Sequence, residues 1–158
     1  MTPAVNLVKK QKIDYSLHSY KPGMSSTESY GEEAAEALGL DKNQVFKTLV
    51  TALNGNKRTL GIALVPVSTM LDLKQFAKAA EVKNAEMAQP ADAQRTTGYI
   101  LGGISPLGQK QKLPTVIDAS LKNFDTVFVS AGKRGLQLEL APEDLIKLTN
   151  AKVGVIAK

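Results

Sequence analysis

Residues 45–67 read VFKTLVTALNGNKRTLGIALVPV and carry the clearest structural signal in the sequence. Two apolar runs, residues 45–53 and 59–67, flank the tripeptide NGN at 54–56. Asparagine and glycine tolerate the positive φ angles that a tight hairpin turn requires, so this stretch predicts a β-hairpin. The strands of a hairpin are antiparallel, which argues against a purely parallel sheet.

Helical and strand patterns are mixed along the rest of the chain. Helices are predicted over residues 2–12, 31–38, 72–80, 90–96 and 142–148. Strands are predicted over residues 15–20, around Met87, and over residues 113–117, 126–130, 136–140 and 152–156, with a polar loop at 24–30 and a turn at 131–135. Because tight turns join several neighbouring strands, we expect an α+β fold with a mixed, mainly antiparallel, barrel-like sheet and surrounding helices.

Composition limits the classes of function that the chain can have. Its 158 residues suit one domain, residues 1–158, and 43% hydrophobic with 22% charged residues is typical of a soluble globular protein. The longest apolar run, residues 60–67, is too short to span a bilayer. With no cysteine and one histidine, a disulfide, a thiol nucleophile and the usual zinc site are excluded, so we expect a cytoplasmic protein without metal or cofactor. The net charge of +5 moderately favours an anionic partner.

A glycine-rich stretch, residues 98–112, reads GYILGGISPLGQKQK. Glycine and proline disfavour a helix here, and the pattern predicts a strand that opens into a rigid loop. Gly102 and Gly103 would let backbone N–H groups approach a ligand closely. A plain tight turn between two strands fits the same pattern, so the sequence leaves both interpretations open.

Lys47 is the most unusual charged residue, because it lies among apolar residues in the first strand of the predicted hairpin. By strand alternation it shares a face with Val45 and Leu49. A lysine in this position either points to solvent from a sheet edge or lies in a partly buried pocket with an anion.

His18 and Tyr20 share a strand face and could both line a pocket, although a lone histidine is usually structural. A catalytic triad of Ser105 or Ser130 with His18 and Asp118 is formally possible. Neither serine lies in the pattern of a nucleophile elbow, which disfavours the triad. The roles of His18 and Asp118 therefore stay open.

Small residues recur at Ser130 and Gly132, next to the cations Lys133 and Arg134. This segment fits either a rim that contacts phosphate or a solvated hairpin tip. Neither it nor the glycine-rich stretch has the Gly-Lys-Ser/Thr ending of a Walker-type phosphate loop.

Three motifs in order carry a resemblance to a known family. They are FKT at 46–48, GGISP at 102–106 and VSAGKRG at 129–135. Together they resemble the editing-domain family of YbaK and the prolyl-tRNA synthetase insertion, and the resemblance covers essentially the whole chain. It implies a mixed α/β, barrel-like domain.

The resemblance also implies an activity. It points to a free-standing trans-editing deacylase that releases cysteine from mischarged Cys-tRNA(Pro), with Cys-tRNA(Cys) as a second candidate substrate. In the YbaK branch the substrate's own thiol would attack its ester carbonyl and form a cyclic thioester. The implied partners are the 3′ end of aminoacylated tRNA and prolyl-tRNA synthetase.

Site residues follow from the matched motifs. Lys47 matches the pocket lysine expected to hold the anionic end of aminoacyl-tRNA, and Gly102 belongs to the loop expected to face the aminoacyl carbonyl. Tyr20 is expected to form a wall of the catalytic pocket. The other residues expected to bind substrate are Tyr30, Phe46, Thr48, Gly103, Ile104, Ser105, Pro106, Ser130 and Gly132.

Two alternatives remain at this stage. The alanyl-specific branch of the family would make the chain an Ala-tRNA(Pro) deacylase. A binding module for tRNA or a synthetase, without turnover, would keep only a basic rim of Lys110, Lys112, Lys133 and Arg134.

Overall fold

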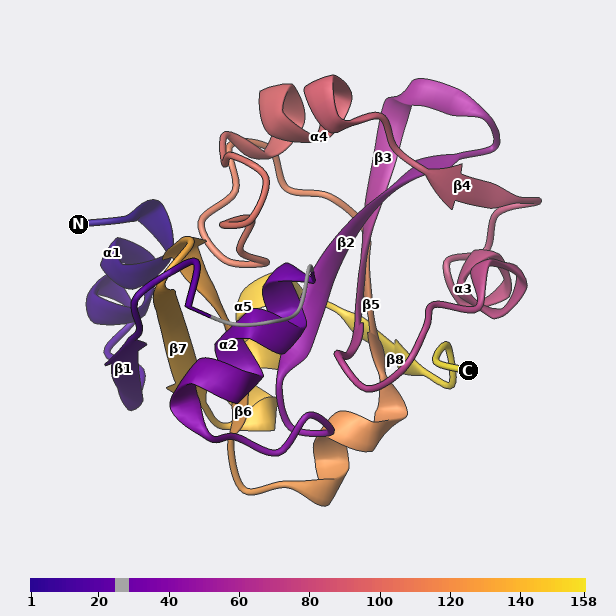
Figure 1. Ribbon diagram of the computed structural model, residues 1–158. Helices are drawn as coiled ribbons and strands as arrows, with labels where there is room; N and C mark the ends of the chain where they lie inside the picture. The colour runs from indigo at the N-terminus through magenta and orange to yellow at the C-terminus, as the bar shows by residue number, and fades with distance from the viewer. Residues whose placement is uncertain (25–28) are drawn as a thin grey trace.

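Two β-sheets form the framework of the protein, which a computed structural model describes over residues 1–24 and 29–158 (Figure 1). The three-stranded sheet has the order β1-β7-β6, and the five-stranded sheet has the order β4-β2-β3-β5-β8. The strands are β1 (Tyr15–Ser19), β2 (Phe46–Leu53), β3 (Asn56–Pro66), β4 (Ala85–Met87), β5 (Thr115–Asp118), β6 (Val127–Lys133), β7 (Leu136–Leu140) and β8 (Lys152–Gly154). The helices are α1 (Pro3–Lys10), α2 (Tyr30–Leu38), α3 (Leu73–Ala79), α4 (Pro90–Thr97) and α5 (Pro142–Thr149), with a 3-10 helix, η1, at Ala119–Asn123.

The hairpin predicted from the sequence is present as β2 and β3. The two strands are antiparallel, and Lys47 lies opposite Val65. Asn54 and Gly55 form the turn with φ angles of 55° and 69°. These are the left-handed conformations that asparagine and glycine adopt at low cost, so the sequence determines the turn locally.

The pairing of the other strands confirms the predicted α+β class. β1 and β6 flank β7 in antiparallel pairs, and β4 pairs antiparallel with β2. β5 pairs parallel with β3 and with β8. The strands form two sheets rather than one closed barrel, and a single bridge between Val45 and Phe128 joins the sheets where β2 begins.

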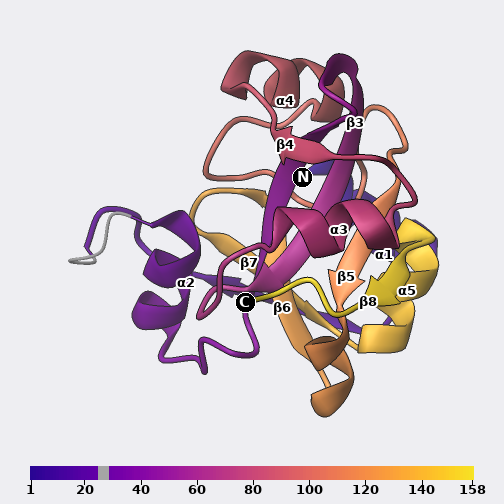
Figure 2. The ribbon, with the colours of Figure 1, turned by 90° about the vertical axis from the view of Figure 1, so that its right-hand side faces the viewer.

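The hairpin is buried on both faces. Ile62 and Leu64 belong to the main hydrophobic core, whereas Ala63 and Val65 pack with Phe76 of α3 on the opposite face. Figure 2 shows α3 lying across this second face. A fully buried Val, Leu, Ile or Phe contributes about 1.5–3 kcal/mol, so the alternation of β3 fixes its register strongly.

Helix boundaries coincide with capping residues. The Thr2 hydroxyl accepts a hydrogen bond from Val5 N at 3.2 Å, and the Asp72 carboxylate accepts from Lys74 N and Gln75 N. Gly39 ends α2 in a left-handed conformation with φ of 65°. These local signals made the helices predictable. None of the helices within residues 1–24 and 29–158 is long and apolar enough to cross a membrane.

Four details of the sequence prediction need correction. Residues 98–112 contain no strand, and the loop that they form is described in the next section. β6 continues to Lys133 through an irregularity in its pairing with β7, so the turn predicted at 131–135 is shorter. β8 ends at Gly154, and the 3-10 helix η1 was not predicted. Of the polar loop predicted at 24–30, residues 25–28 lie outside the described part of the chain.

Candidate active site

A pocket of about 250 Å³ opens where the two sheets meet. It lies between the start of α2, the first half of β2, the glycine-rich loop and the strands β6 and β7. Its lining residues are Ser29, Tyr30, Gly31, Val45, Phe46, Lys47, Thr48, Leu49, Leu101, Gly102, Ile104, Ser130 and Gln137. The pocket therefore combines segments that are distant in the sequence, and its walls are mostly apolar.

Lys47 provides the positive charge of the pocket lining. Its Nζ donates a hydrogen bond to the Thr69 carbonyl at 2.7 Å. An ammonium group has three donors, so two remain for a ligand. Partial burial lowers the pKa of Lys47 from its ordinary value of 10.5, and the negative charge of Glu32 acts in the opposite direction. The sequence left two positions open for Lys47, and the pocket position is the one observed.

Gly102 lies directly across the pocket mouth from α2, against the ring of Tyr30. Its φ is +91°, and a Cβ at this position would lie 3.2 Å from Cε1 of Tyr30. Only glycine fits both the conformation and the close approach without strain. The wall formed by Tyr30 and the loop therefore depends on the absence of a side chain at Gly102.

The glycine-rich loop is held in place by hydrogen bonds at both ends. Leu101 N donates to the Gln94 side chain at 2.9 Å, and Gly103 N donates to Ile100 O at 3.0 Å. Lys110 N donates to Thr97 O at 2.9 Å and closes the loop. Inside it, the hydroxyl of Tyr99 donates to Leu107 O at 2.6 Å. The loop is thus a defined wall built without β-structure.

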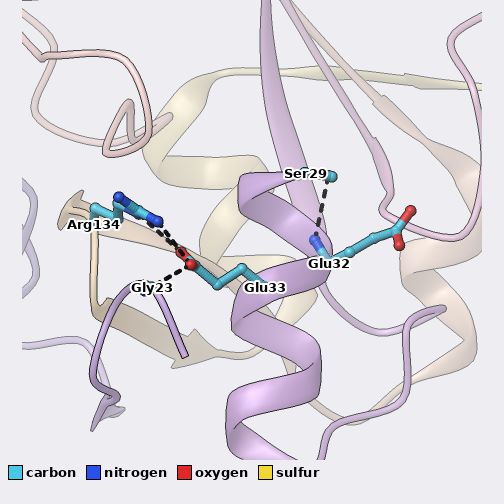
Figure 3. Close-up of polar contacts among 5 residues, drawn as sticks. All are labelled: Gly23, Ser29, Glu32, Glu33 and Arg134. Atoms are coloured by element: carbon cyan, nitrogen blue, oxygen red, sulfur yellow. Dashed lines mark hydrogen bonds and ion pairs between the residues drawn. The ribbon is translucent and has the colours of Figure 1, made fainter. Parts of the chain in front are cut away.

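An ion pair lies next to Tyr30, one of the residues that line the pocket. Glu33 is almost fully buried, and Arg134 donates to its two carboxylate oxygens at 2.9 and 2.7 Å (Figure 3). Gly23 N donates to the same carboxylate at 3.0 Å. The hydrogen bonds from Arg134 hold the pKa of Glu33 below its ordinary value. The Arg134 guanidinium also lies 5.1 Å from the centre of the Tyr30 ring, so the pair positions Tyr30.

Two buried oxygen atoms in the lining have no hydrogen-bond partner among the described residues. They are Oγ1 of Thr48 and Oε1 of Gln137. Gln137 is only 7% exposed, and in the β6–β7 pair it lies opposite Ser130. A buried polar group without a partner costs about 1–3 kcal/mol, which a donor on a bound ligand would recover. The pocket therefore offers donors from Lys47 and acceptors from Thr48 and Gln137 to one small polar ligand.

A comparison with models of known families identifies the family of the chain. The model of the family described as "Aminoacyl-tRNA editing domain" matches residues 25–148. The chain belongs to this family. Editing domains of this kind remove an amino acid from tRNA, so the predicted activity class, an aminoacyl-tRNA deacylase, is confirmed.

Relatives of this editing domain have related names. A proposed Cys-tRNA(Pro)/Cys-tRNA(Cys) deacylase, EbsC of Enterococcus faecalis (strain ATCC 700802 / V583), is 42% identical over 98% of this chain and 92% of its own. The multifunctional Ser/Thr-tRNA deacylase ProXp-y of Escherichia coli (strain K12) is 25% identical over 94% of this chain and 87% of its own. A solved structure of a proposed trans-editing enzyme for prolyl-tRNA synthetase has the same fold, with a TM-score of 0.80 and 23% identity over 100% of this chain and 99% of that one.

Most of the site residues expected from the sequence lie together in the pocket. Those that line it are Tyr30, Phe46, Lys47, Thr48, Gly102, Ile104 and Ser130. Those that lie outside its lining are Tyr20, Gly103, Ser105, Pro106 and Gly132. Apart from Tyr20, the second group belongs to the motifs at 102–106 and 129–135, so these motifs contain both lining residues and residues behind the lining.

The residues outside the lining have visible structural roles. Ser105 is fully buried, and its hydroxyl accepts a hydrogen bond from Leu107 N at 3.2 Å. Pro106 faces a second cavity of about 200 Å³. A Cβ on Gly103 would lie 2.8 Å from Cα of Lys133, so Gly103 allows the loop to pack on β6.

Gly132 and Tyr20 also lie outside the lining and contact residues near the pocket. A Cβ on Gly132 would lie 2.8 Å from the Tyr99 ring, and its φ is +102°. Tyr20 N donates to Gly135 O at 2.9 Å, next to the Glu33–Arg134 pair, and burial raises the pKa of the Tyr20 hydroxyl. Tyr20 and Tyr30 therefore both lie near Arg134, but only Tyr30 lines the pocket.

The formal triad does not form. His18 is hydrogen-bonded to Glu139 at 2.8 Å. The Asp118 carboxylate accepts hydrogen bonds from Ile156 N and Ala157 N, both at 3.0 Å, and so anchors the C-terminal segment. Each candidate member has a structural partner elsewhere.

Sequence reasoning missed several lining residues. These are Ser29, Gly31, Val45, Leu49, Leu101 and Gln137. One signal was available for Gln137, because residues 136–140 alternate and place it on the face opposite to Leu136, Leu138 and Leu140. The others required knowledge of how α2 and the loop pack against β2.

Proposed function

We propose that this protein is a trans-editing deacylase that releases cysteine from Cys-tRNA(Pro) and from Cys-tRNA(Cys). The observation that carries the proposal is one small pocket with Lys47 on one wall and the Gly102 loop on the other. The relative EbsC, 42% identical over almost the whole chain, supports cysteine as the amino acid. A pocket of about 250 Å³ suits a small side chain and part of a ribose.

The proposed binding mode assigns one group to each feature of the substrate. Lys47 holds the anionic end of the aminoacyl-tRNA with its two remaining donors. The α-ammonium group of cysteine donates to Thr48 Oγ1 and Gln137 Oε1, which have no other partner among the described residues. The backbone N–H of Gly102 is assigned to the ester carbonyl, because the N–H groups of Leu101 and Gly103 are used within the loop. This arrangement orients the ester without a nucleophile from the protein.

The proposed chemistry uses the thiol of the substrate. A cysteine thiol with a pKa near 8.5 is partly ionised at neutral pH, and its sulfur attacks the carbonyl carbon of its own ester. A carbon–sulfur bond forms, the bond from the carbonyl carbon to the ribose oxygen breaks, and that oxygen takes up the proton that the thiol lost. The products are free tRNA and a cyclic thioester, which water opens to cysteine. Loss of one donor to a developing oxyanion typically costs about 2.7–4 kcal/mol, which sets the scale for the loop's contribution.

A panel of charged tRNAs tests the proposal. We expect fast release of cysteine from Cys-tRNA(Pro) and Cys-tRNA(Cys), slow release of alanine from Ala-tRNA(Pro), and slow release of serine from Ser-tRNA. No release from any charged tRNA would refute the enzymatic function. Preferred release of alanine, or of serine as the name of ProXp-y suggests for that relative, would instead reassign the amino acid.

A substrate without a thiol tests the mechanism separately. 2-Aminobutyryl-tRNA(Pro) nearly keeps the size of the side chain, with a methyl group in place of the thiol, and cannot attack its own carbonyl. We expect no release above the spontaneous rate from this substrate. Release at the rate of Cys-tRNA(Pro) would show that water attacks directly, while leaving the deacylase function intact.

The proposal includes a synthetase partner in the cytoplasm. The solved structure described as a trans-editing enzyme for prolyl-tRNA synthetase suggests this partner, although its likeness supports only the fold. Gel filtration of the protein with prolyl-tRNA synthetase and charged tRNA should give a ternary species. Elution of the three components separately would argue against the partner.

A further inference from the structure

One end of the molecule carries a group of exposed cations. Lys57 and Arg58 follow the hairpin turn on β3, and Arg95 lies on α4. These three residues line one cavity together with Asp92, which pairs with Arg95 at 2.6 Å, so Lys57 and Arg58 carry the positive charge that this cavity offers to a ligand. Lys110 joins them at the base of the glycine-rich loop, where its backbone meets Thr97 at the end of α4. Figures 1 and 2 both show the hairpin turn and α4 side by side at this end, which we call the basic end.

An exposed apolar turn connects the basic end to the pocket. Ile100 is 77% exposed and Leu101 is 43% exposed, and Leu101 also lines the pocket. Both are fixed by the hydrogen bonds of the loop described above. Leu101 lies three positions after Gly98, which is beside Lys110, and three positions span at most about 11 Å. Large apolar side chains held rigidly in water at a pocket mouth are typical of a binding surface.

The opposite side of the pocket has a different charge. α2 carries three glutamates: Glu33 is buried, Glu32 is half-buried and Glu36 is exposed. Lys42 lies within 3.7–3.8 Å of Glu32 and Glu36, and Arg134 is committed to Glu33. The cations Lys42 and Arg134 on the α2 side are thus paired with carboxylates, so an anionic strand that leaves the pocket is attracted more strongly toward the basic end.

We propose that the RNA strand esterified to the amino acid leaves the pocket over Ile100 and Leu101 and continues along the basic end. The two apolar side chains contact the unpaired terminal bases, and Lys57, Arg58 and Lys110 contact phosphates. This inference rests on the proposed function, because it assigns the RNA path of the same site. It replaces the basic rim expected from the sequence, since Arg134 is engaged by Glu33 and the residues of the hairpin turn were not part of that rim.

Binding of uncharged tRNA tests the path independently of catalysis. The double variant Lys57→Ala/Arg58→Ala should weaken binding about tenfold at 0.1 M salt. The plot of log Kobs against log salt should become shallower by about 1.4–1.8, because two phosphate contacts are lost. The control Lys122→Ala/Lys147→Ala removes the same charge from exposed positions on η1 and α5 and should keep the wild-type slope.

The apolar turn has its own test. Ile100→Ser should weaken binding of a short single-stranded RNA that ends in CCA about fivefold, because a stacking contact is lost. It should leave the salt slope unchanged. Circular dichroism spectra and melting temperatures equal to wild type would show that the variants are folded.

Turnover separates this inference from the proposed function. On Cys-tRNA(Pro), Lys57→Ala/Arg58→Ala should raise KM about tenfold with little change in kcat, and cleavage of the cysteinyl ester of adenosine should match wild type, because that substrate has no phosphates. A wild-type salt slope and KM in this variant would overturn the RNA path while the deacylase function stands. Salt-dependent tRNA binding without any turnover by the wild-type protein would refute the function and leave the path intact. Loss of binding to prolyl-tRNA synthetase alone, with tRNA binding unchanged, would assign the basic end to a protein partner and overturn the inference.

Discussion

Arg134 and Glu33, 101 residues apart in the chain, form a two-bond ion pair that fixes the end of β6 against α2. Because Arg134 also lies over the ring of Tyr30, this pair connects the fold to the shape of the pocket mouth. Glu33 is buried, whereas the side chain of Arg134 is 42% exposed. The carboxylate therefore depends on the pair more than the guanidinium does.

Removing Arg134 should harm both stability and substrate binding. Among the described residues, Arg134→Ala leaves the buried Glu33 with only the N–H of Gly23 as a donor, and it releases Tyr30. We expect a lower urea midpoint and a several-fold higher KM with Cys-tRNA(Pro). The double variant Arg134→Ala/Glu33→Gln should regain part of the stability, because no buried charge remains. An unchanged urea midpoint in Arg134→Ala would contradict this account.

The same pair predicts a dependence of stability on pH. The pKa of Glu33 is lowered in the folded state from 4.5, so the unfolded state binds more protons as the pH falls. The contribution of Glu33 is fully present at neutral pH and is lost as the pH falls below about 4.5 through the folded pKa. The difference in free energy of unfolding between wild type and Glu33→Gln should be constant from about pH 6 to 8. It should shrink as the pH falls below about 4.5. Urea titrations at each pH measure it, and a difference that grows on acidification would have the wrong sign.

Lys47 is expected to be needed for activity and not for stability. Burial lowers its pKa, so its charged form is costly in the folded state. Lys47→Met should reduce kcat/KM on Cys-tRNA(Pro) about 10²–10³-fold while the melting temperature stays equal or rises slightly. Lys78→Met, at an exposed position on α3, is the control and should change neither. A large loss of melting temperature in Lys47→Met would indicate a structural role.

The two adjacent glycines of the loop should respond differently to alanine. Gly102→Ala meets the Tyr30 ring, which can move, and should lower the free energy of unfolding by about 1 kcal/mol through its positive φ, with a clear loss of activity. Gly103→Ala meets the backbone of Lys133 at 2.8 Å, which cannot move easily, and should cost about 1–3 kcal/mol. Denaturant unfolding and deacylation assays would compare them. Equal stability losses would show that the backbone of β6 yields as readily as a side chain.

Gln137 is expected to lower the stability of the folded protein and to contribute to substrate binding. Gln137→Met keeps the length of the side chain but removes the buried Oε1 that has no partner among the described residues. We expect the free energy of unfolding to rise by about 1 kcal/mol and KM to rise as well, because the α-ammonium group loses an acceptor. Gln75→Met, at an exposed position on α3, should affect neither quantity. A stability loss in Gln137→Met would mean that Oε1 is satisfied in the folded protein.

Local signals explain why most of the fold was predictable. The hairpin turn at 54–56, the N-cap Asp72 and the C-cap Gly39 each depend on residues only a few positions apart in the sequence. The glycine-rich stretch was different. Tyr99, Ile104 and Leu107 resemble strand residues because they are apolar, yet they enter the core from an irregular backbone held by side-chain hydrogen bonds.

The site was predictable where a motif and the lining coincide, as for Lys47 and Gly102. It was not predictable where long-range packing decides position. Tyr20 lies near the Glu33–Arg134 pair and outside the pocket lining, and no local pattern encodes that pair. Gln137 enters the lining only because β7 pairs with β6 across from Ser130.

The walls of the pocket belong to different sheets, and these sheets are connected at the Val45–Phe128 bridge where β2 begins. If the three-stranded sheet rotated about this bridge, the width of the pocket would change without the loss of a hydrogen bond within either sheet. Substitutions under α1, which packs on β6, would then shift amino-acid selectivity while leaving every contact residue unchanged.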